Sequence, residues 1–519
     1  MSLLAHSLPA LFAQAQAFTP PSGSEYMRIL PELVLSVFGM IVMFVDPLLD
    51  ENRSQKSLGT IALIGALAAL ASTFFTAQYP GSAFWNMVRV DGFSVFFHFL
   101  VIAIAAVVIL SSYEYMAVQR IRAGEYYGLI LFGTVGMCLM SSAVELVLIF
   151  IALEISSIST YVLAGFRRHE ASSSESSLKY FLLGSFATAF FLYGVALMFG
   201  ATGSTNIDAI SHALHSGNVP VLAYVAVALM FVGLGFKVAS APFHVWTPDV
   251  YEGAPAPIVG LMSTGPKAAA FAVLLRVMFE INAPGRFWLI WVSAALSMTL
   301  GNLGALVQDN VKRLLAYSSI AHAGYLLIGF AVLRDFGTST LGVSAAMFYT
   351  AAYAATNVGA FAVVSHFANA GEKYVTLEDY AGLGRRSPML AATLAFFLMS
   401  LIGIPITGGF FAKFYVLSAA LKADLVGLTI IGVLNSAVGA YYYLRIIVMM
   451  YMREPRGEVP VTSAPPATAL AIAVCVLATL YLGVFPGRVL DLATQSASQL
   501  LRSATTIGAT LPSSTGPAQ

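Results

Sequence analysis

Long, continuous apolar stretches dominate the hydrophobic pattern of this chain. A helix needs about 20 apolar residues to cross the core of a bilayer, and fourteen stretches of that kind can be counted. They lie near residues 29–49, 57–77, 92–112, 126–142, 144–166, 177–200, 221–241, 256–279, 287–308, 312–333, 340–368, 388–405, 425–450 and 466–485. The pattern therefore predicts an all-α polytopic membrane protein with about fourteen transmembrane helices.

The composition agrees with this pattern. Hydrophobic residues make up 58% of the 519 residues and charged residues only 10%, whereas soluble domains have about 25% charged residues. So few charges could not cover a water-soluble protein of this size, which excludes soluble, disordered and nucleic-acid-binding classes. Cys138 and Cys475 lie in separate apolar stretches with no second ligand nearby, so we expect no metal site.

Lysine and arginine residues in the loops predict the orientation. Fourteen of the 26 lie in loops that follow odd-numbered stretches, and eight lie in even-numbered loops and the termini. Loops rich in these residues stay on the cytoplasmic side. We therefore expect the loop at residues 167–176 to face the cytoplasm and both termini to lie outside.

The remaining four cations fall inside predicted transmembrane stretches. They are Lys179, Lys237, Lys267 and Lys413, and Glu154 adds a carboxylate in the fifth stretch. Each lysine at mid-bilayer depth costs roughly 2.5–3.5 kcal/mol on insertion scales. A row of such groups bridged by water can pass protons, because a nearby charge switches the protonation of a buried lysine.

Some charges near these stretches have a simpler interpretation. Lys179 lies close to the start of its stretch, so its side chain could instead reach the membrane interface. Glu32 and Glu145 lie nearer the ends of theirs, and we expect them at the interface. For His322, in the tenth stretch, a packing role and a role in proton transfer both stay open.

Proline and glycine interrupt two of the stretches. One interruption lies in residues 233–249 around Pro242, and the other lies in residues 402–413 around Pro405 and the two glycines that follow it. Proline removes a helix hydrogen bond, and the freed backbone groups need water or polar partners. These breaks therefore mark candidate ion pathways.

The two breaks occupy matching places in an internal repeat. Pro242 and Pro405 are 163 residues apart, and Ser156-Ser157-Ile158 recurs as Ser318-Ser319-Ile320 at an offset of 162. Stretches four to eight thus repeat as nine to thirteen, and the odd number of five inverts the second copy. The predicted units are residues 1–125 (three stretches), 126–279 (first repeat), 287–450 (inverted repeat) and 451–519 (last stretch and tail).

Residues 237–257 carry a resemblance to a known family. They read Lys-Val-Ala-Ser-Ala-Pro-Phe-His-Val-Trp-Thr-Pro-Asp-Val-Tyr-Glu-Gly-Ala-Pro-Ala-Pro. This stretch resembles the signature of the antiporter-like membrane subunits of respiratory NADH–quinone oxidoreductase (complex I). The resemblance extends from Leu30 to the thirteenth stretch and is strongest to the subunit N group. The chain has no room for the long lateral helix of subunit L, and Lys413 stands where subunit M has Glu.

The resemblance implies that this chain translocates protons and assigns roles to six residues. In the first half, Glu154 resembles the carboxylate that modulates the broken-helix lysine, Lys237 resembles that lysine, and Lys179 is similar to an additional lysine of subunit N.

In the second half, the resemblance makes Lys267 the central connecting lysine and Lys413 the lysine of the second half-channel. His322 falls in a region that helps to hydrate that half.

The same resemblance implies the setting of this chain. It would bind no cofactor and carry no redox or metal site, with FMN and iron–sulfur clusters expected in partner subunits of the complex. NADH and quinone would meet it only through the whole assembly, and its partners would be other membrane-arm subunits and the lipid bilayer. No nucleic acid is expected, and the expected location is a bacterial inner membrane.

Two related functions stay open at this point. Components of Mrp-type cation/proton antiporters and membrane subunits of hydrogenase-like complexes carry similar motifs, so this chain could be either. Lys413 and the length of the chain favour the subunit of complex I.

Overall fold

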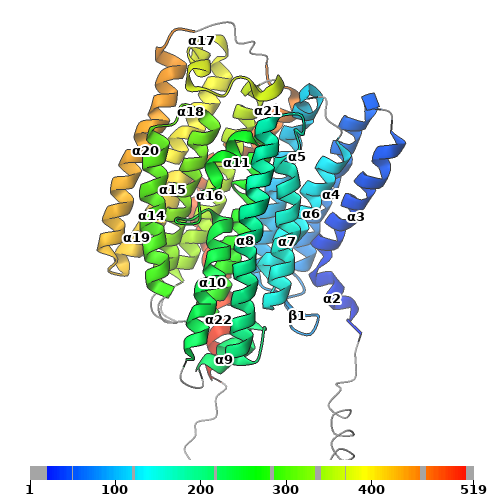
Figure 1. The fold of residues 1–519 in the computed structure, drawn as a ribbon, viewed down its shortest axis with the longest axis vertical. Coiled ribbons are helices and arrows are strands. Elements are labelled where there is room, and N and C mark those ends of the chain that lie inside the picture. The colour runs from blue at the N-terminus through cyan, green and yellow to red at the C-terminus, as the bar shows by residue number, and fades with distance from the viewer. Residues whose placement is uncertain are drawn as a thin grey trace, which may run out of the picture.

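The computed structural model describes residues 20–49, 51–119, 123–215, 219–280, 286–333, 340–368, 370–455 and 463–509. These residues form a bundle of long helices with one short β-hairpin, β1 (Gly81–Ala83) paired with β2 (Val88–Val90), at one end (Figure 1). The α-helices are α2 (Gly23–Arg28), α3 (Leu30–Val45), α4 (Glu51–Thr76), α5 (Gly92–Gln119), α6 (Gly124–Ser142), α7 (Leu146–Ala164), α8 (Ala171–Thr202), α9 (Ile207–His215), α10 (Val221–Val238), α11 (Thr247–Gly253), α12 (Ala256–Met262), α13 (Gly265–Glu280), α14 (Arg286–Leu306), α15 (Val311–Ala331), α16 (Leu341–Ala368), α17 (Leu383–Arg386), α18 (Pro388–Ile402), α19 (Gly408–Lys422), α20 (Val426–Met452), α21 (Pro466–Val484) and α22 (Pro486–Ala509). Three short 3-10 helices are η1 (Asp46–Leu48), η2 (Ala370–Glu372) and η3 (Leu377–Tyr380). The predicted all-α polytopic fold is confirmed.

Each predicted stretch coincides with helix in the part of the chain that the structure describes. Twelve helices there are long and apolar enough to cross a membrane. The predicted fourth and twelfth stretches fall outside those twelve. The helix α6 has a polar first turn around Glu125, and α18 has only 15 residues before the chain continues as α19. The orientation of the bundle in the membrane stays a prediction.

Both predicted helix breaks are present. The chain leaves α10 after Val238 and becomes helical again at α11, and it leaves α18 after Ile402 and resumes at α19. The residues that follow α10 and α18 have a left-handed backbone conformation, with φ of 58° at Ala239 and 96° at Gly403. Glycine adopts that conformation without strain, whereas alanine does not. The two breaks therefore have a common local geometry.

Equivalent contacts in the two halves support the inverted repeat. Glu145 caps α7 and forms a β-bridge with Asn206, while Asn310 caps α15 and forms a β-bridge with Thr376. In each repeat, the residue that caps the second helix (α7 or α15) thus pairs with a residue that follows the third helix (α8 or α16). Figure 1 shows α9, which follows Asn206, at the hairpin end of the bundle, and α17, which follows Thr376 closely, at the other end. The limits of the four units stay a proposal.

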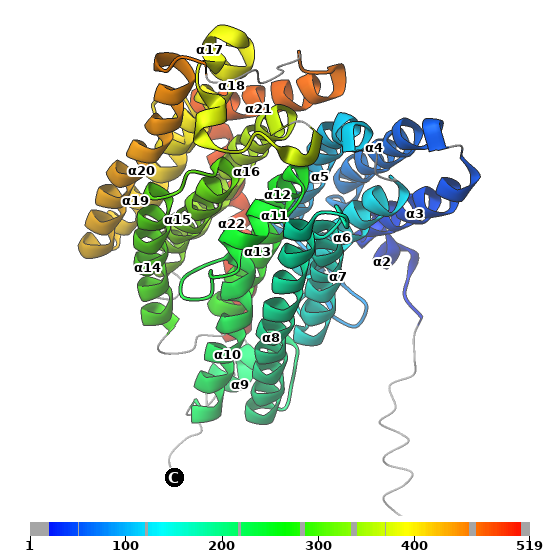
Figure 2. The same cartoon turned by 45° about the horizontal axis from the view of Figure 1, so that its top comes forward.

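Two features were not predicted from the sequence. The eighth stretch is also broken, because α12 ends at Met262 and α13 begins at Gly265. The tail, about which the sequence indicated nothing, forms the long helix α22, which packs against α5, α16 and α9. In Figure 2 this red helix passes behind the centre of the bundle.

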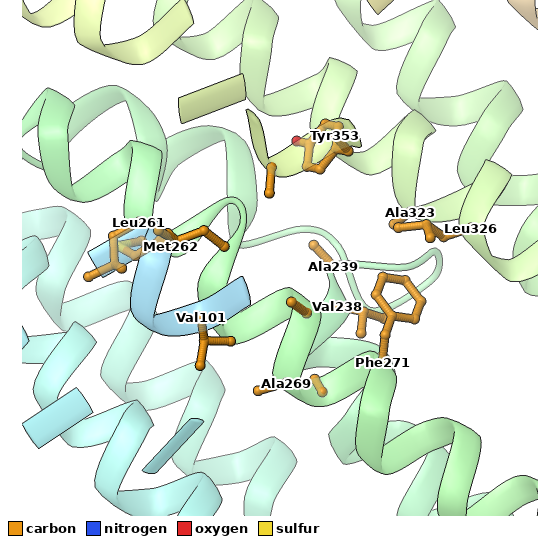
Figure 3. Close-up of a cluster of buried hydrophobic side chains, with 14 of the residues drawn as sticks. Val101, Val238, Ala239, Leu261, Met262, Ala269, Phe271, Ala323, Leu326 and Tyr353 are labelled. Atoms are coloured by element: carbon orange, nitrogen blue, oxygen red, sulfur yellow. The ribbon is translucent and has the colours of Figure 1, made fainter. Parts of the chain in front are cut away.

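The core of the bundle consists of the broken eighth stretch and the helices α15 and α16. Residues 256–278 are wholly buried among other helices, as helices that are apolar on all sides must be. Figure 3 shows apolar side chains of α10, α13 and α15, among them Val238, Phe271 and Leu326, gathered around this core. Lys237 and Lys267 lie on these same helices. The charged groups are therefore placed where side chains are held most tightly.

Candidate functional site: a buried row of lysines beside the helix breaks

Lys237 is held at the broken end of α10. Its side chain is 3% exposed, and its Nζ donates to Ser157 Oγ on α7 at 2.8 Å. The same Nζ lies 5.7 Å from the ring centres of Tyr161 and Tyr180. The ammonium thus sits between one hydroxyl and two aromatic faces, which are weak partners for a full charge.

Glu154 supplies the nearest negative charge. It lies on α7 one turn before Ser157, and its carboxylate acts electrostatically on Lys237. Its Oε1 atom is buried and has no hydrogen-bond partner among the described residues. The charge of Glu154 therefore acts on Lys237 across the space between α7 and α10.

Lys267 begins the second part of the row. It lies in the first turn of α13, directly after the unpredicted break, and is 3% exposed. Its Nζ donates to both the carbonyl oxygen (2.9 Å) and the hydroxyl (2.6 Å) of Ser319 on α15. Ser157 and Ser319 are 162 residues apart. The repeated serines found in the sequence thus each receive a hydrogen bond from a buried lysine.

His322 lies one turn after Ser319 and joins a cluster of tyrosines. Its Nδ1 is 2.7 Å from the hydroxyl of Tyr349 and its Nε2 is 3.2 Å from that of Tyr443. The Tyr353 ring stacks on the imidazole at 4.9 Å. A cavity of about 10 Å³ lies beside these groups and reaches Ser400 at the end of α18. That volume is close to the smallest that holds one water.

Lys413 is the last lysine of the row and lies beside the second predicted break. It is 7% exposed and lies in α19, from where its Nζ donates to the carbonyl of Ile402 (2.9 Å) and to Ser436 Oγ (3.0 Å). The Ile402 carbonyl is at the broken end of α18, where no helix hydrogen bond uses it. Tyr325, on the same helix as His322, lies under the ammonium at 5.0 Å.

The row is suited to proton exchange. Within the described residues, no carboxylate lies within ion-pair distance of Lys237, Lys267 or Lys413, and neutral oxygen atoms are their hydrogen-bond partners. A permanent charge so placed is costly, whereas a lysine that gains and loses a proton avoids that cost for part of the cycle. Hydroxyls and imidazole can both donate and accept, so they can carry the proton between lysines.

Lys179 lies elsewhere. Its side chain is 40% exposed, and its Nζ binds Asp249 at 2.6 Å and Glu175 at 2.7 Å. Asp249 in turn binds Arg313 at 2.6 Å. Burial opposes the ionisation of Asp249, but its hydrogen bonds from Lys179 and Arg313 prevail and lower the pKa of this carboxyl. Lys179 thus belongs to an ion network at the surface, and its ion pairs among the described residues are with Glu175 and Asp249 rather than with the row.

A first prediction concerns this network. Lys179→Ala should leave the free energy of unfolding almost unchanged, because exposed ion pairs contribute little and Asp249 keeps Arg313. Turnover of the assembled protein should fall much less than for Lys237→Ala. Thermal unfolding and turnover of both variants are the measurements. An equal loss of turnover in the two would place Lys179 within the proton pathway.

A second charged cluster was missed in the sequence because its members lie in loops and at helix ends. Glu372 binds Lys312 Nζ at 2.5 Å and lies 3.4 Å from Arg167, and all three are buried. The other carboxylate oxygen accepts from the Tyr115 hydroxyl (2.9 Å) and the Ala256 amide (2.7 Å). Burial alone raises the pKa of Glu372, but Lys312 and Arg167 outweigh it and hold that pKa below its ordinary value.

Two further carboxylates were expected at the interface. Glu145 is buried and caps the start of α7, where it accepts from the Leu148 amide at 2.7 Å. Glu32, in the first turn of α3, is 4% exposed and lies against His98 of α5, and its depth in the membrane stays a prediction. In the described residues, no group of three or more His, Cys, Asp or Glu side chains could hold a metal ion.

Comparisons with known proteins agree on one family. A protein-family model described as "NADH:quinone oxidoreductase/Mrp antiporter, TM" matches residues 143–439. The chain is 68% identical over 486 residues to "NADH-quinone oxidoreductase subunit N 2" of Koribacter versatilis, over 92% of this chain and 98% of that protein. It is similar to a chain of respiratory complex I from Thermus thermophilus with bound aureothin, with a TM-score of 0.76 and 38% identity. The similarity covers 89% of this chain and 99% of that chain. A chain of the Mrp complex from Dietzia shares the fold, with a TM-score of 0.78 and 22% identity. The similarity covers 93% of this chain and 99% of that chain.

Proposed function

Because this chain belongs to the NADH:quinone oxidoreductase/Mrp antiporter family, in its subunit N branch, we propose that it translocates protons as a membrane-arm subunit of a bacterial NADH–quinone oxidoreductase. The single observation that carries this proposal is the row of buried lysines. Each lies beside a helix break, and hydroxyls and His322 continue the polar groups from Lys267 toward Lys413. The chain would convert a change of charge or shape elsewhere in the complex into proton movement.

The geometry supports a role for each of these residues. Glu154 and Lys237 form the first half of the pathway, Lys267 connects the halves, and Lys413 serves the second half. His322 bridges Tyr349 and Tyr443 between Lys267 and Lys413, which favours the transfer role over simple packing. Lys179 would act at most at the mouth of the pathway, in its surface ion network.

Electron transfer belongs to other subunits in this proposal. FMN and iron–sulfur clusters would be bound by partner subunits, and this chain would carry no redox site. Its partners would be the other membrane-arm subunits, and its location would be the bacterial inner membrane. The Mrp-type alternative is less favoured, because the likeness to the Mrp chain is at 22% identity and the likeness to a subunit N is at 68%.

The experiment that tests the proposal is Lys267→Ala in the assembled complex, reconstituted into vesicles. Removing the connecting lysine should lower proton pumping with NADH and quinone by about tenfold or more, since a positioned proton-transfer group contributes on the order of 10²–10⁴ in rate. The measurement is proton-gradient formation together with quinone reduction.

Lys422→Ala is the matched control, because Lys422 is an exposed lysine at the end of α19. It should pump normally. Normal pumping by assembled Lys267→Ala would reject the proposal. A dependence of wild-type pumping on Na⁺ or K⁺ across the vesicle membrane would favour the antiporter alternative.

A further inference from the structure

A second pair of protonatable groups is buried outside the lysine row. Glu32 lies in the first turn of α3, and His98 lies on α5 with no exposed surface. The His98 Nε2 atom is 3.4 Å from Glu32 Oε1 and 3.0 Å from the carbonyl oxygen of Cys138 on α6. Three helices of the N-terminal unit and the first repeat thus meet at one imidazole.

The Cys138 carbonyl decides where the proton of His98 lies. A carbonyl oxygen can only accept a hydrogen bond, so Nε2 must carry the hydrogen. The Nδ1 atom then presents a free lone pair, and it is buried without a hydrogen-bond partner in the described residues. Neither Oε1 nor Oε2 of Glu32 has a hydrogen-bond partner there either.

The lack of hydrogen bonds to Glu32 among the described residues is not what a structural carboxylate would show. Glu145, which is also buried, accepts from the Leu148 amide, and Glu372 accepts from Lys312, Tyr115 and Ala256. An unpaired buried carboxylate is costly unless it takes up a proton. Ionisable groups at membrane depth mark function by default.

Hydrogen bonds connect this pair to one end of the bundle. The Cys138 carbonyl also accepts from Ser141 Oγ at 2.8 Å, and the Ser141 carbonyl accepts from Arg276 Nε at 3.0 Å. Arg276 binds Asp91, the residue between strand β2 and α5. These contacts thus lead from the Cys138 carbonyl to Asp91, beside the hairpin (Figure 1).

We propose that Glu32 and His98 form a second proton-exchange site, separate from the lysine row. This inference rests on the proposed function. A proton that binds at Nδ1 gives an imidazolium. The Nε2–H bond then breaks toward the Glu32 carboxylate, leaving neutral His98 with hydrogen on Nδ1 and a protonated Glu32. Return of that proton through Nε2 reverses the step, so no other reactant is needed.

The test is Glu32→Gln in the assembled complex, with Glu145→Gln as the matched control. Glutamine keeps the size and the accepting oxygen of Glu32 but cannot take up a proton. We expect Glu32→Gln to lower the protons pumped per quinone reduced at least twofold, and Glu145→Gln to change it little. Infrared difference spectra of the wild-type complex should show a carboxylic acid band that Glu32→Gln lacks and Glu145→Gln keeps.

His98→Gln covers the case in which Glu32→Gln does not assemble. Its amide can still donate to the Cys138 carbonyl, but it cannot pass a proton, so pumping should again fall at least twofold. Normal pumping and an unchanged carboxylic acid band in an assembled variant would overturn the site. Failure of both variants to assemble would also overturn it, by showing that the pair is structural. Lys267→Ala, measured in parallel, separates the two proposals, because it tests the row alone.

Discussion

Lys237→Ala should lower proton pumping and coupled quinone reduction by about tenfold or more while the complex still assembles. The substitution removes a switchable charge from a site where the Ser157 hydroxyl is the hydrogen-bond partner. Lys237→Arg should also impair pumping, because a guanidinium keeps its proton. The measurement is quinone reduction together with proton-gradient formation in vesicles for each variant.

Glu154 is the second arm of this prediction. Without its carboxylate, the protonated form of Lys237 loses its nearby opposite charge and is populated less. Glu154→Gln should therefore be as harmful as Glu154→Ala, because the charge rather than the size of the side chain is what matters. Glu170→Gln, at an exposed carboxylate just before α8, is the matched control and should pump normally. Normal turnover and pumping by fully assembled Lys237→Ala would remove Lys237 from the pathway.

Glu372→Gln should have the largest effect on stability. It leaves Lys312 and Arg167 buried without their counter-charge, and breaking a buried pair in this way costs about 3–5 kcal/mol. We expect a lower thermal unfolding temperature and a lower yield of assembled complex. Glu454→Gln, at an exposed carboxylate just after α20, is the matched control and should be close to wild type. The double variant Glu372→Gln/Lys312→Met should recover part of the loss, because it leaves fewer unpaired charges.

The pH dependence of this effect has a definite sign. The pKa of Glu372 is lower in the folded chain than its ordinary value, because Lys312 and Arg167 outweigh burial. Its stabilising contribution is therefore fully present above the ordinary pKa of Glu and is lost as pH falls through the lowered pKa. The unfolding temperatures of wild type and Glu372→Gln should differ most at neutral pH and converge in acid. A constant difference across that range would reject the ionised state of Glu372.

The sequence by itself determined the features that depend on local composition. Continuous apolar stretches predict helices wherever backbone groups must be satisfied inside a membrane, and each predicted stretch is helical in the described residues. Proline and glycine predicted the breaks after Val238 and Ile402, because both act on the backbone of their own helix. Lys237, Lys267 and Lys413 could be singled out from the sequence, because a charge within an apolar transmembrane stretch is costly and is therefore rare without a function.

Only the tertiary structure decided which groups meet. Glu32 and Lys179 both lie near the start of a stretch, yet Glu32 is buried against His98 and Lys179 is exposed beside Asp249. The residues that Glu372 contacts include Tyr115, 257 positions away in the chain. The burial and the ion pairing of a charged side chain depend on which helices pack against each other. Helices that are apolar on every side have no polar face from which their neighbours could be predicted. The partners of each charge, and with them its role, therefore follow from packing between distant segments.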